Sequence, residues 1–218
     1  PLCENEDLVL LDNSIGATSW DWSASSFNSN EQNPAPFAVT SSEDYTLVVT
    51  AANTCTDEAT INVVVNPLPQ VTIQTSDIIC EEGDITIEEI AGQANSWNWS
   101  GPNSFTSDQS SFDLTNISQT QSGTYFVTAT DANTCENTAS VDININALPT
   151  LSLSTNAALP DGLCEGEQLI IEDESANLGT WDWLDGNANP YSGKVITIDN
   201  ATLTDAGTYF VTLTDANG

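Results

Sequence analysis

The sequence predicts an all-β protein made of tandem β-sandwich domains. Apolar residues alternate with polar ones over short segments, as in half-buried strands, and no segment has apolar residues at helical spacing. Gly, Pro, Asn and Asp separate these segments and favour turns. A pattern of Cys, Trp and Tyr recurs three times along the 218 residues. We therefore expect about three small domains rather than one large domain.

The repeated pattern keeps a strict register. A cysteine stands 17 residues before each Trp-x-Trp triplet, at Cys3, Cys80 and Cys164. A tyrosine follows each triplet, and in the first two copies a second cysteine lies ten residues after that tyrosine, at Cys55 and Cys135. We expect the repeated aromatic residues to be core residues: Trp20, Trp22, Trp97, Trp99, Trp181, Trp183, Tyr45, Tyr125 and Tyr209. An exposed platform that stacks sugars is the alternative for the tryptophans.

Proline-containing links separate the copies, at residues 66–69 and 146–149. They predict domains at 1–66, which lacks its first strand, at 67–147, and at 148–218, which lacks its last strand. Because proline stiffens short links, we expect the domains to form a semi-rigid rod. The chain begins and ends inside a copy, so we expect it to be part of a longer protein.

The alternation also assigns strands and the side chains that face the core. In the middle copy we expect strands around Val71 and Ile73, Ile85 and Ile87, Trp97 and Trp99, Phe112 and Leu114, Tyr125 to Ala129, and Val141 to Ile145. The first copy should end on a strand with Ile61, Val63 and Val65 facing inward. Phe126 and Phe210 should face outward and are candidates for a contact surface.

The composition excludes several classes of function. The net charge is −31 with one basic residue, Lys194, so nucleic acid and anionic membranes are unfavourable partners. No apolar run approaches the ~20 residues of a membrane-spanning helix, so we expect no direct membrane insertion. The chain has no histidine, which excludes His-based catalytic triads and His-ligated zinc. No serine lies in a nucleophile-elbow motif, and we expect no enzymatic activity.

The tyrosine segment of the third copy resembles that of immunoglobulin-like sandwiches. A Trp-containing strand precedes Asp205-x-Gly207-x-Tyr209. The resemblance implies tandem immunoglobulin-like β-sandwich domains in which the tyrosine hydroxyl fixes the turn before its strand. The middle copy has Gln121 in place of the aspartate, and the first copy departs further, with Glu43 in place of the glycine.

The complete pattern resembles a narrower group of proteins. It combines Cys-Glu, Trp-x-Trp, Gly-Thr-Tyr-x-Val and Thr-Asp-Ala-Asn-x-Cys. This combination is similar to the immunoglobulin-like and PKD-like repeats of giant secreted Bacteroidota surface proteins. These include the gliding-motility adhesins that the type IX secretion system exports. The resemblance covers the whole chain.

The resemblance implies a stalk or filament segment of a cell-surface, extracellular repeat adhesin, acting in surface attachment or gliding motility. Neighbouring repeats of the same chain would be its partners, together with surface glycans or other adhesin components. A set of carbohydrate-binding accessory modules of a large secreted enzyme is one alternative. A self-associating surface filament subunit is another.

The five cysteines predict structural disulfides and an oxidising compartment. Pairing within copies would join Cys3 to Cys55 and Cys80 to Cys135. In immunoglobulin topology, however, the start of the second strand and the end of the sixth lie at opposite ends of the sandwich. A seven-residue strand spans roughly 23 Å, whereas a disulfide requires Cα atoms at most about 7 Å apart. The resemblance therefore favours an inter-domain bond between Cys3 and Cys135. Cys55, Cys80 and Cys164 would then pair with cysteines outside the chain.

Acidic residues accompany the cysteines at both expected joints between copies. They suggest calcium as a possible bound ion, because calcium takes six to eight oxygen ligands, although no Asp-x-Asp-x-Asp-Gly loop is present. Exposed turn residues are the alternative interpretation. We expect no other cofactor. The candidate ligands are Glu4, Glu6, Asp7, Asp131 and Glu136 at one joint, and Glu81, Glu82, Asp84 and Asp215 at the other.

Overall fold

The computed structural model describes residues 2–76, 80–157 and 162–217. The chain is almost entirely strand and turn, with three short 3₁₀ turns in the described part. It divides into two compact units: Pro1–Thr75 with Thr86–Asp113 and Ser122–Ile143, and Ser76–Ile85 with Leu114–Gln121 and Asn144–Gly218. Both units include part of the middle copy, so the expected boundaries after residues 66 and 147 stay a prediction.

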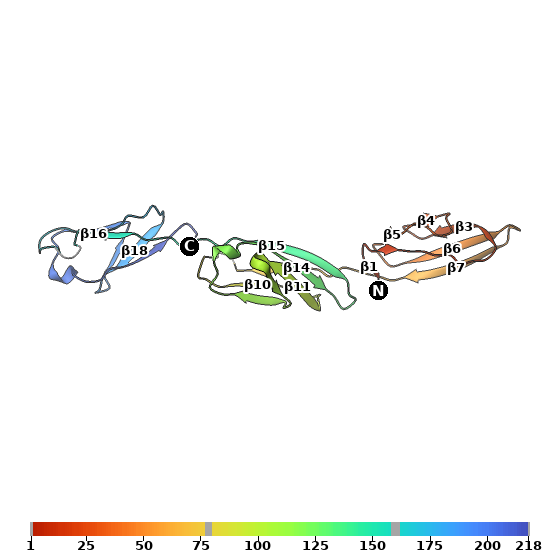
Figure 1. Ribbon diagram of the computed structural model, residues 1–218, viewed down its shortest axis with the longest axis horizontal. Coiled ribbons are helices and arrows are strands. Elements are labelled where there is room, and N and C mark those ends of the chain that lie inside the picture. The colour runs from red at the N-terminus through yellow and green to blue at the C-terminus, as the bar shows by residue number, and fades with distance from the viewer. Residues whose placement is uncertain (1, 77–79, 158–161, 218) are drawn as a thin grey trace. The chain divides into compact units, whose positions relative to one another are not determined.

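The middle repeat has the strand pairing of an immunoglobulin-like sandwich (Figure 1). One sheet has the order β13-β10-β9 and the other the order β12-β11-β14-β15, which corresponds to E-B-A and C′-C-F-G. Its elements are β9 (Ile73–Thr75), β10 (Ile85–Glu89), β11 (Ser96–Gly101), η1 (Pro102–Ser104), β12 (Phe105–Ser107), β13 (Ser111–Leu114), η2 (Gln119–Gln121), β14 (Gly123–Thr130) and β15 (Glu136–Ile143).

The first repeat has the same F–G hairpin and a shorter opposite sheet. Its four-stranded sheet has the order β4-β3-β6-β7, and the pairs β2–β5 and β1–β8 stand beside it. The β1–β8 pair is parallel. The strands are β1 (Leu2–Cys3), β2 (Asp7–Leu8), β3 (Ala17–Ser23), β4 (Asn28–Ser29), β5 (Phe37–Ala38), β6 (Glu43–Ala51), β7 (Thr56–Val63) and β8 (Val65–Asn66).

The third repeat has two three-stranded sheets in its described part, β16-β17-β20 and β19-β18-β21. In this described part, β21 is the last strand, and no strand follows it in the place that β15 takes in the middle repeat. The elements are β16 (Leu153–Thr155), β17 (Leu169–Asp173), β18 (Thr180–Leu184), β19 (Pro190–Ser192), β20 (Val195–Ile198), η3 (Leu203–Asp205) and β21 (Phe210–Thr214). The sequence therefore predicts the fold class correctly: tandem immunoglobulin-like β-sandwiches.

Alternation along the strands places the cores. In β14, Tyr125, Val127 and Ala129 are buried, whereas Phe126 between them is 54% exposed. The second tryptophan of each triplet is buried in its repeat, at Trp22, Trp99 and Trp183. The sequence thus identifies which face of each strand packs inward, because side chains alternate between the two faces of a sheet.

Two details of the strand assignment differ from expectation. Ile61 is 55% exposed although it lies opposite the buried Tyr45, because β7 is the outermost strand of its sheet in the described part of this repeat. Val71 lies outside β9, which begins at Ile73.

Candidate functional site

Each repeat contains a turn of the same construction, which we call the cysteine turn: residues 3–6, 80–83 and 164–167. The amide of the fourth residue donates to the carbonyl of the cysteine, at N–O distances of 3.1, 3.2 and 3.2 Å. The third residue is left-handed in all three, with φ of 70° at Asn5, 65° at Glu82 and 90° at Gly166. Asn and Gly accept this conformation more readily than Glu does.

The cysteine turn is fastened to the core of its own repeat. Its third amide donates to the carbonyl of a buried residue, namely Val39, Ile117 or Ala201, at 2.7, 2.8 and 2.9 Å. The amide of that same buried residue donates back to the fourth residue of the turn. Two backbone bonds therefore hold each cysteine at a fixed place at the end of its sandwich.

In the first two repeats the cysteine turn also joins the end of the last strand. Cys3 pairs with Asn66, and Cys80 pairs with Asn146, both in parallel orientation. The amide of Glu4 donates to the Asn66 carbonyl at 2.8 Å, and that of Glu81 to the Asn146 carbonyl at 2.9 Å. The last strand therefore closes each sandwich against its cysteine turn.

The second cysteine lies in the hairpin turn between β14 and β15. The amide of Asp131 donates to the Cys135 carbonyl at 3.0 Å, and Thr134 is left-handed with φ of 67°. The Asp131 carboxylate accepts from the amides of Asn133 and Cys135 at 2.8 and 2.9 Å. In turns, the Asp side chain commonly accepts a hydrogen bond from the backbone amide two residues further along the chain. The sequence Asp-Ala-Asn-Thr-Cys therefore forms a hydrogen-bonded turn that fixes the backbone position of Cys135.

The first repeat builds the same turn between β6 and β7. The Ala51 amide donates to the Cys55 carbonyl at 2.9 Å, and Thr54 is left-handed with φ of 68°. Asn53 provides the side-chain acceptor for the Cys55 amide at 3.2 Å.

A disulfide joins the first cysteine turn to the hairpin turn of the middle repeat. It links Cys3 and Cys135 across a sequence separation of 132, with Cα atoms 5.6 Å apart. Both cysteines are buried. This is the inter-domain pairing that the resemblance favours, and the alternative pairs Cys3–Cys55 and Cys80–Cys135 do not form. Cys55 and Cys164 are exposed in the equivalent turns.

The acidic residues near the cysteines bond to backbone amides. Glu6 accepts from the Cys3 amide at 2.7 Å, Glu81 from Gln119 at 3.1 Å and Asp84 from Asn116 at 2.9 Å. Asp215 accepts from Asn217 at 2.8 Å. Among the described residues, no group of three or more His, Cys, Asp or Glu is placed to hold a metal ion. The structure thus brings several candidate calcium ligands to turns but does not assemble them into a site.

A carboxylate bonds the first tryptophan of every triplet. The indole nitrogen donates to Asp12 at 2.6 Å from Trp20, to Glu89 at 3.3 Å from Trp97, and to Asp173 at 2.9 Å from Trp181. In each case the acid precedes the tryptophan by eight residues. The sequence reasoning missed these acids, although their constant spacing across the copies was a visible signal.

The second tryptophan of every triplet has an equally regular partner. Its indole nitrogen donates to a backbone carbonyl ten residues later, from Trp22, Trp99 and Trp183 at 3.3, 2.9 and 2.8 Å. Both tryptophans of a triplet therefore satisfy their N–H groups within the repeat, and the second of each triplet is buried, whereas Trp20 and Trp97 are only partly buried. This arrangement supports the core interpretation of the tryptophans over the sugar platform.

Asp173 is the most enclosed of the acids that bond tryptophan, at 1% exposed. Besides Trp181, its carboxylate accepts from the amides of Ser152 and Ser175 at 2.8 and 3.0 Å and from the Ser175 hydroxyl at 2.5 Å. Desolvation raises the pKa of Asp173, but the hydrogen bonds outweigh it and hold that pKa well below its ordinary value. The Ser14 side chain, with weaker help from Trp20, likewise lowers the pKa of Asp12.

In the first and third repeats, the hydroxyl of the repeated tyrosine bonds to a residue two or four positions before it. In the third repeat the Tyr209 hydroxyl donates to the Asp205 carbonyl at 2.8 Å. In the first repeat the Tyr45 hydroxyl instead donates to the Glu43 carboxylate at 3.0 Å. Glu43 stands where the third repeat has Gly207, so the substituted side chain supplies the acceptor.

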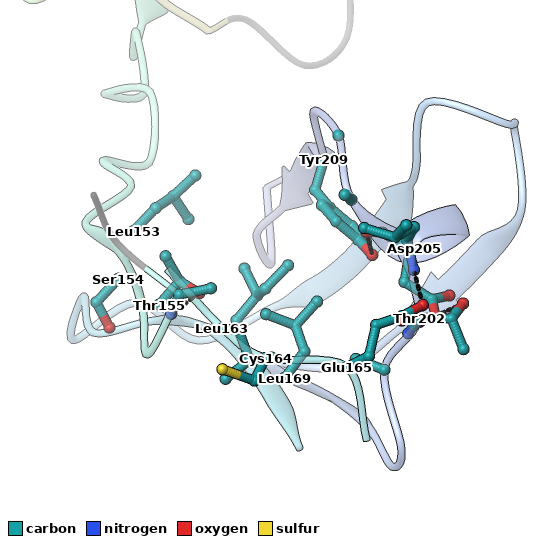
Figure 2. Close-up of a pocket in the computed structure, with 16 residues that line it drawn as sticks. Leu153, Ser154, Thr155, Leu163, Cys164, Glu165, Leu169, Thr202, Asp205 and Tyr209 are labelled. Atoms are coloured by element: carbon teal, nitrogen blue, oxygen red, sulfur yellow. Dashed lines mark hydrogen bonds between the residues drawn. The ribbon is translucent and has the colours of Figure 1, made fainter. Parts of the chain in front are cut away.

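The third repeat contains a groove that the sequence reasoning did not anticipate. Figure 2 shows Leu163 and Leu169 near the middle of the lining, below Tyr209, with Glu165 between Leu169 and Thr202. Its volume is about 650 Å³, and all of its lining belongs to the third repeat.

No protein-family model matches the chain, and no curated protein matches its sequence. Solved structures with a similar fold include the eight N-terminal immunoglobulin domains of the Down syndrome cell adhesion molecule (TM-score 0.46, 13% identity, 98% of this chain and 38% of that chain). A 1.5-MDa bacterial ice-binding adhesin is similar at TM-score 0.36 and 14% identity, covering 99% and 87%. Murine CEACAM1b is similar at a TM-score of 0.35 and 15% identity, over 67% of this chain and 93% of that chain. At these values the likenesses carry no inference about function.

Proposed function

We propose that this chain is a load-bearing segment of an extracellular repeat protein, an adhesin stalk or surface filament. The observation that carries the proposal is the Cys3–Cys135 disulfide, which joins a turn of the first repeat to a turn of the second. Disulfides persist in oxidising compartments, so the bond fits an extracellular protein. In the described part of the chain, no helix is long and apolar enough to cross a membrane.

The disulfide changes how the chain responds to tension. Force that enters near the first cysteine turn passes through the covalent bond to Cys135 and bypasses the residues between them. The sheets of the first repeat, including the long β6–β7 hairpin, lie within this bypassed stretch. Unfolding them then releases no length along the direction of pull.

The same device is available at the other cysteine turns. Cys80 and Cys164 occupy the position of Cys3, and Cys55 occupies that of Cys135, with matching backbone bonds. We propose that Cys55 and Cys164, which are exposed, pair with equivalent cysteines of neighbouring repeats outside the chain. A single bond would then become a chain of covalent joints.

The narrower role is surface attachment or gliding motility after export by the type IX system. The similarity of the repeats to those of Bacteroidota surface adhesins supports this role. The second tryptophan of each triplet favours a mechanical role over a carbohydrate-binding one, because its ring is buried and its N–H group bonds to backbone inside its repeat.

Stretching of single molecules from residues 1 and 218 tests the mechanical role. The oxidised chain should extend less than the reduced chain by roughly 470 Å, because the bond withholds 132 residues at about 3.6 Å each. Cys3→Ser should behave as the reduced chain under both conditions, and Cys55→Ser should behave as the parent. Equal contour lengths for oxidised and reduced chains would contradict the proposal.

A further inference from the structure

The Cys3–Cys135 disulfide is enclosed at both of its cysteines. Cys3 is 5% exposed and Cys135 is 0% exposed. A thiol that reduces a disulfide attacks as its thiolate and must reach one of the two sulfur atoms. Reduction of this bond therefore requires a local opening of the turns that carry the cysteines.

A carboxylate holds the backbone amide of each of these cysteines. The Cys3 amide donates to the Glu6 carboxylate at 2.7 Å. The Cys135 amide donates to the Asp131 carboxylate at 2.9 Å. Because the side chain and the amide nitrogen of a residue share one Cα, a negative charge lies close to each sulfur of the disulfide.

Equivalent turns elsewhere in the chain form without these charges. In the hairpin turn of the first repeat, the cysteine amide donates to the Asn53 side chain at 3.2 Å, and Ala51 occupies the position of Asp131. The second cysteine turn has Gly83 where the first has Glu6. The charges of Glu6 and Asp131 are therefore not needed to build the turns, and they are a separate property of the disulfide.

Thiol–disulfide exchange moves negative charge through this region. The thiolate of a low-molecular-weight thiol bonds to one sulfur, the sulfur–sulfur bond breaks, and the other cysteine leaves as a thiolate. A second thiolate then attacks the small molecule's sulfur in the mixed disulfide, and the remaining cysteine leaves. Two thiols are thus oxidised to their disulfide, the protein disulfide takes up two electrons, and the protons pass through water to the cysteines. Both the attacking and the leaving charge lie beside a carboxylate.

We propose that Glu6 and Asp131 make the Cys3–Cys135 bond selective for the charge of its reductant. Thiols that carry an additional negative charge are repelled at both cysteines, and the net charge of −31 adds to this repulsion. Thiols that carry an ammonium group are repelled least and reduce the bond fastest. This inference rests on the proposed load-bearing role, because reduction ends the transfer of force through the bond.

Parallel reductions of the oxidised chain with two thiols of different charge test this selectivity. Cysteamine forms a thiolate that is neutral overall, whereas 3-mercaptopropionate forms one with two negative charges. Aliquots are alkylated with N-ethylmaleimide and digested, and mass spectrometry quantifies the surviving Cys3–Cys135 peptide pair. Each rate is divided by the thiolate concentration and by the rate of the same thiol with a small uncharged disulfide.

The normalised rate should be higher for cysteamine by about tenfold or more at an ionic strength of about 0.01 M. The ratio of the two rates should fall toward one at about 1 M salt, where the screening length is only about 3 Å. This salt dependence is measured on the parent chain and needs no variant.

Charge-neutral substitutions assign the effect to the two carboxylates. Glu6→Gln combined with Asp131→Asn keeps an oxygen acceptor for both cysteine amides and removes both charges. It should lower the rate ratio about threefold or more at low salt. Glu31→Gln combined with Asp113→Asn removes the same charge at exposed positions outside both turns and should leave the ratio unchanged.

The selectivity is overturned if both thiols reduce the bond at equal normalised rates, or if the double variant and its control change the ratio equally. Recovery of the linked peptide pair before reductant is added shows that the disulfide itself is present, so either result then refutes the selectivity alone. Absence of the pair at that point refutes the load-bearing role as well.

Discussion

At the scale of single residues, one tryptophan per repeat fills the space between the sheets. Trp99 is fully buried, and its N–H donates to the Gln109 carbonyl. Trp99→Ala should lower the free energy of unfolding of the middle repeat by about 3–5 kcal/mol, because it removes a large buried side chain and leaves a cavity. Phe126→Ala is the matched control on an exposed position and should change it by within about 0.5 kcal/mol. Urea unfolding followed by tryptophan fluorescence measures both, and equal effects would refute the assignment of the inward face.

Glu43 gives the first repeat a specific pH dependence. Hydrogen bonds from the Ser25 and Ser26 hydroxyls, with a weaker one from Tyr45, lower the pKa of Glu43 from 4.5 to about 2. As the pH falls, the unfolded chain takes up this proton before the folded chain does. The stabilisation from this carboxylate is therefore complete above pH 4.5 and lost as the pH falls toward 2.

Glu43→Gln should remove this part of the pH dependence. The stability difference between parent and variant should be largest near neutral pH and shrink below pH 4.5. Comparing variant with parent cancels the change in overall repulsion among the many other acids. Glu31→Gln, at an exposed position, is the control. A parent–variant difference that stays constant from neutral to acid pH would show that the serine bonds to Glu43 do not form.

At the scale of the elements, each cysteine turn requires a left-handed third residue. The residue at that position differs between the repeats: Asn5, Glu82 and Gly166. Glu82 holds φ of 65° at the position where the third repeat has Gly166. Because a side chain in this conformation is strained by roughly 1 kcal/mol, Glu82→Gly should relieve strain in the middle repeat. Gly166→Glu should introduce it in the third, where a Cβ has open space and only the backbone conformation opposes it.

Opposite changes in stability are therefore expected from these two reciprocal substitutions. Differential scanning calorimetry of each variant against the parent measures them. Changes of the same sign would show that the two turns do not share one conformation.

The strands and the repeat were predictable from sequence, and the turn bonds were predictable only in part. Alternating side chains at Tyr125 to Ala129 reveal an inward face because period-2 burial is local to a strand. Asp131 and Cys135 could be assigned to one turn because their bonds span few residues. The Leu203 amide donates to the Glu165 carboxylate, which lies 38 residues earlier in the chain, and no local sequence pattern indicates this hydrogen bond.

The acids that bond tryptophan occupy an intermediate case. Their spacing of eight residues is regular in the sequence, but an acid near a strand end is ordinarily read as solvent-exposed. Only the packing of the repeat shows Glu89 and Asp173 to be buried. The groove of the third repeat could not be inferred either, because it depends on how far Tyr209 is left uncovered.

At the scale of the whole molecule, the chain contains 32 acidic residues and one basic residue, Lys194. Self-repulsion of this net charge opposes the compact state, and the screening length falls from about 30 Å to about 3 Å between 0.01 and 1 M salt. Sodium chloride should therefore raise the thermal unfolding midpoint steadily over this range. A midpoint insensitive to salt would mean that repulsion contributes little.

A further rise of the unfolding midpoint with calcium at equal ionic strength, reversed by EDTA, would show that the acids near the cysteine turns bind that ion.

A covalent bond between Cys3 and Cys135 joins the first two repeats. Mass spectrometry of a non-reducing digest of the purified chain, with free thiols blocked beforehand, tests it most directly. We expect a disulfide-linked peptide pair containing Cys3 and Cys135, which disappears on reduction and in Cys135→Ser. Recovery of Cys80 linked to Cys135, or of Cys3 linked to Cys55, would contradict it.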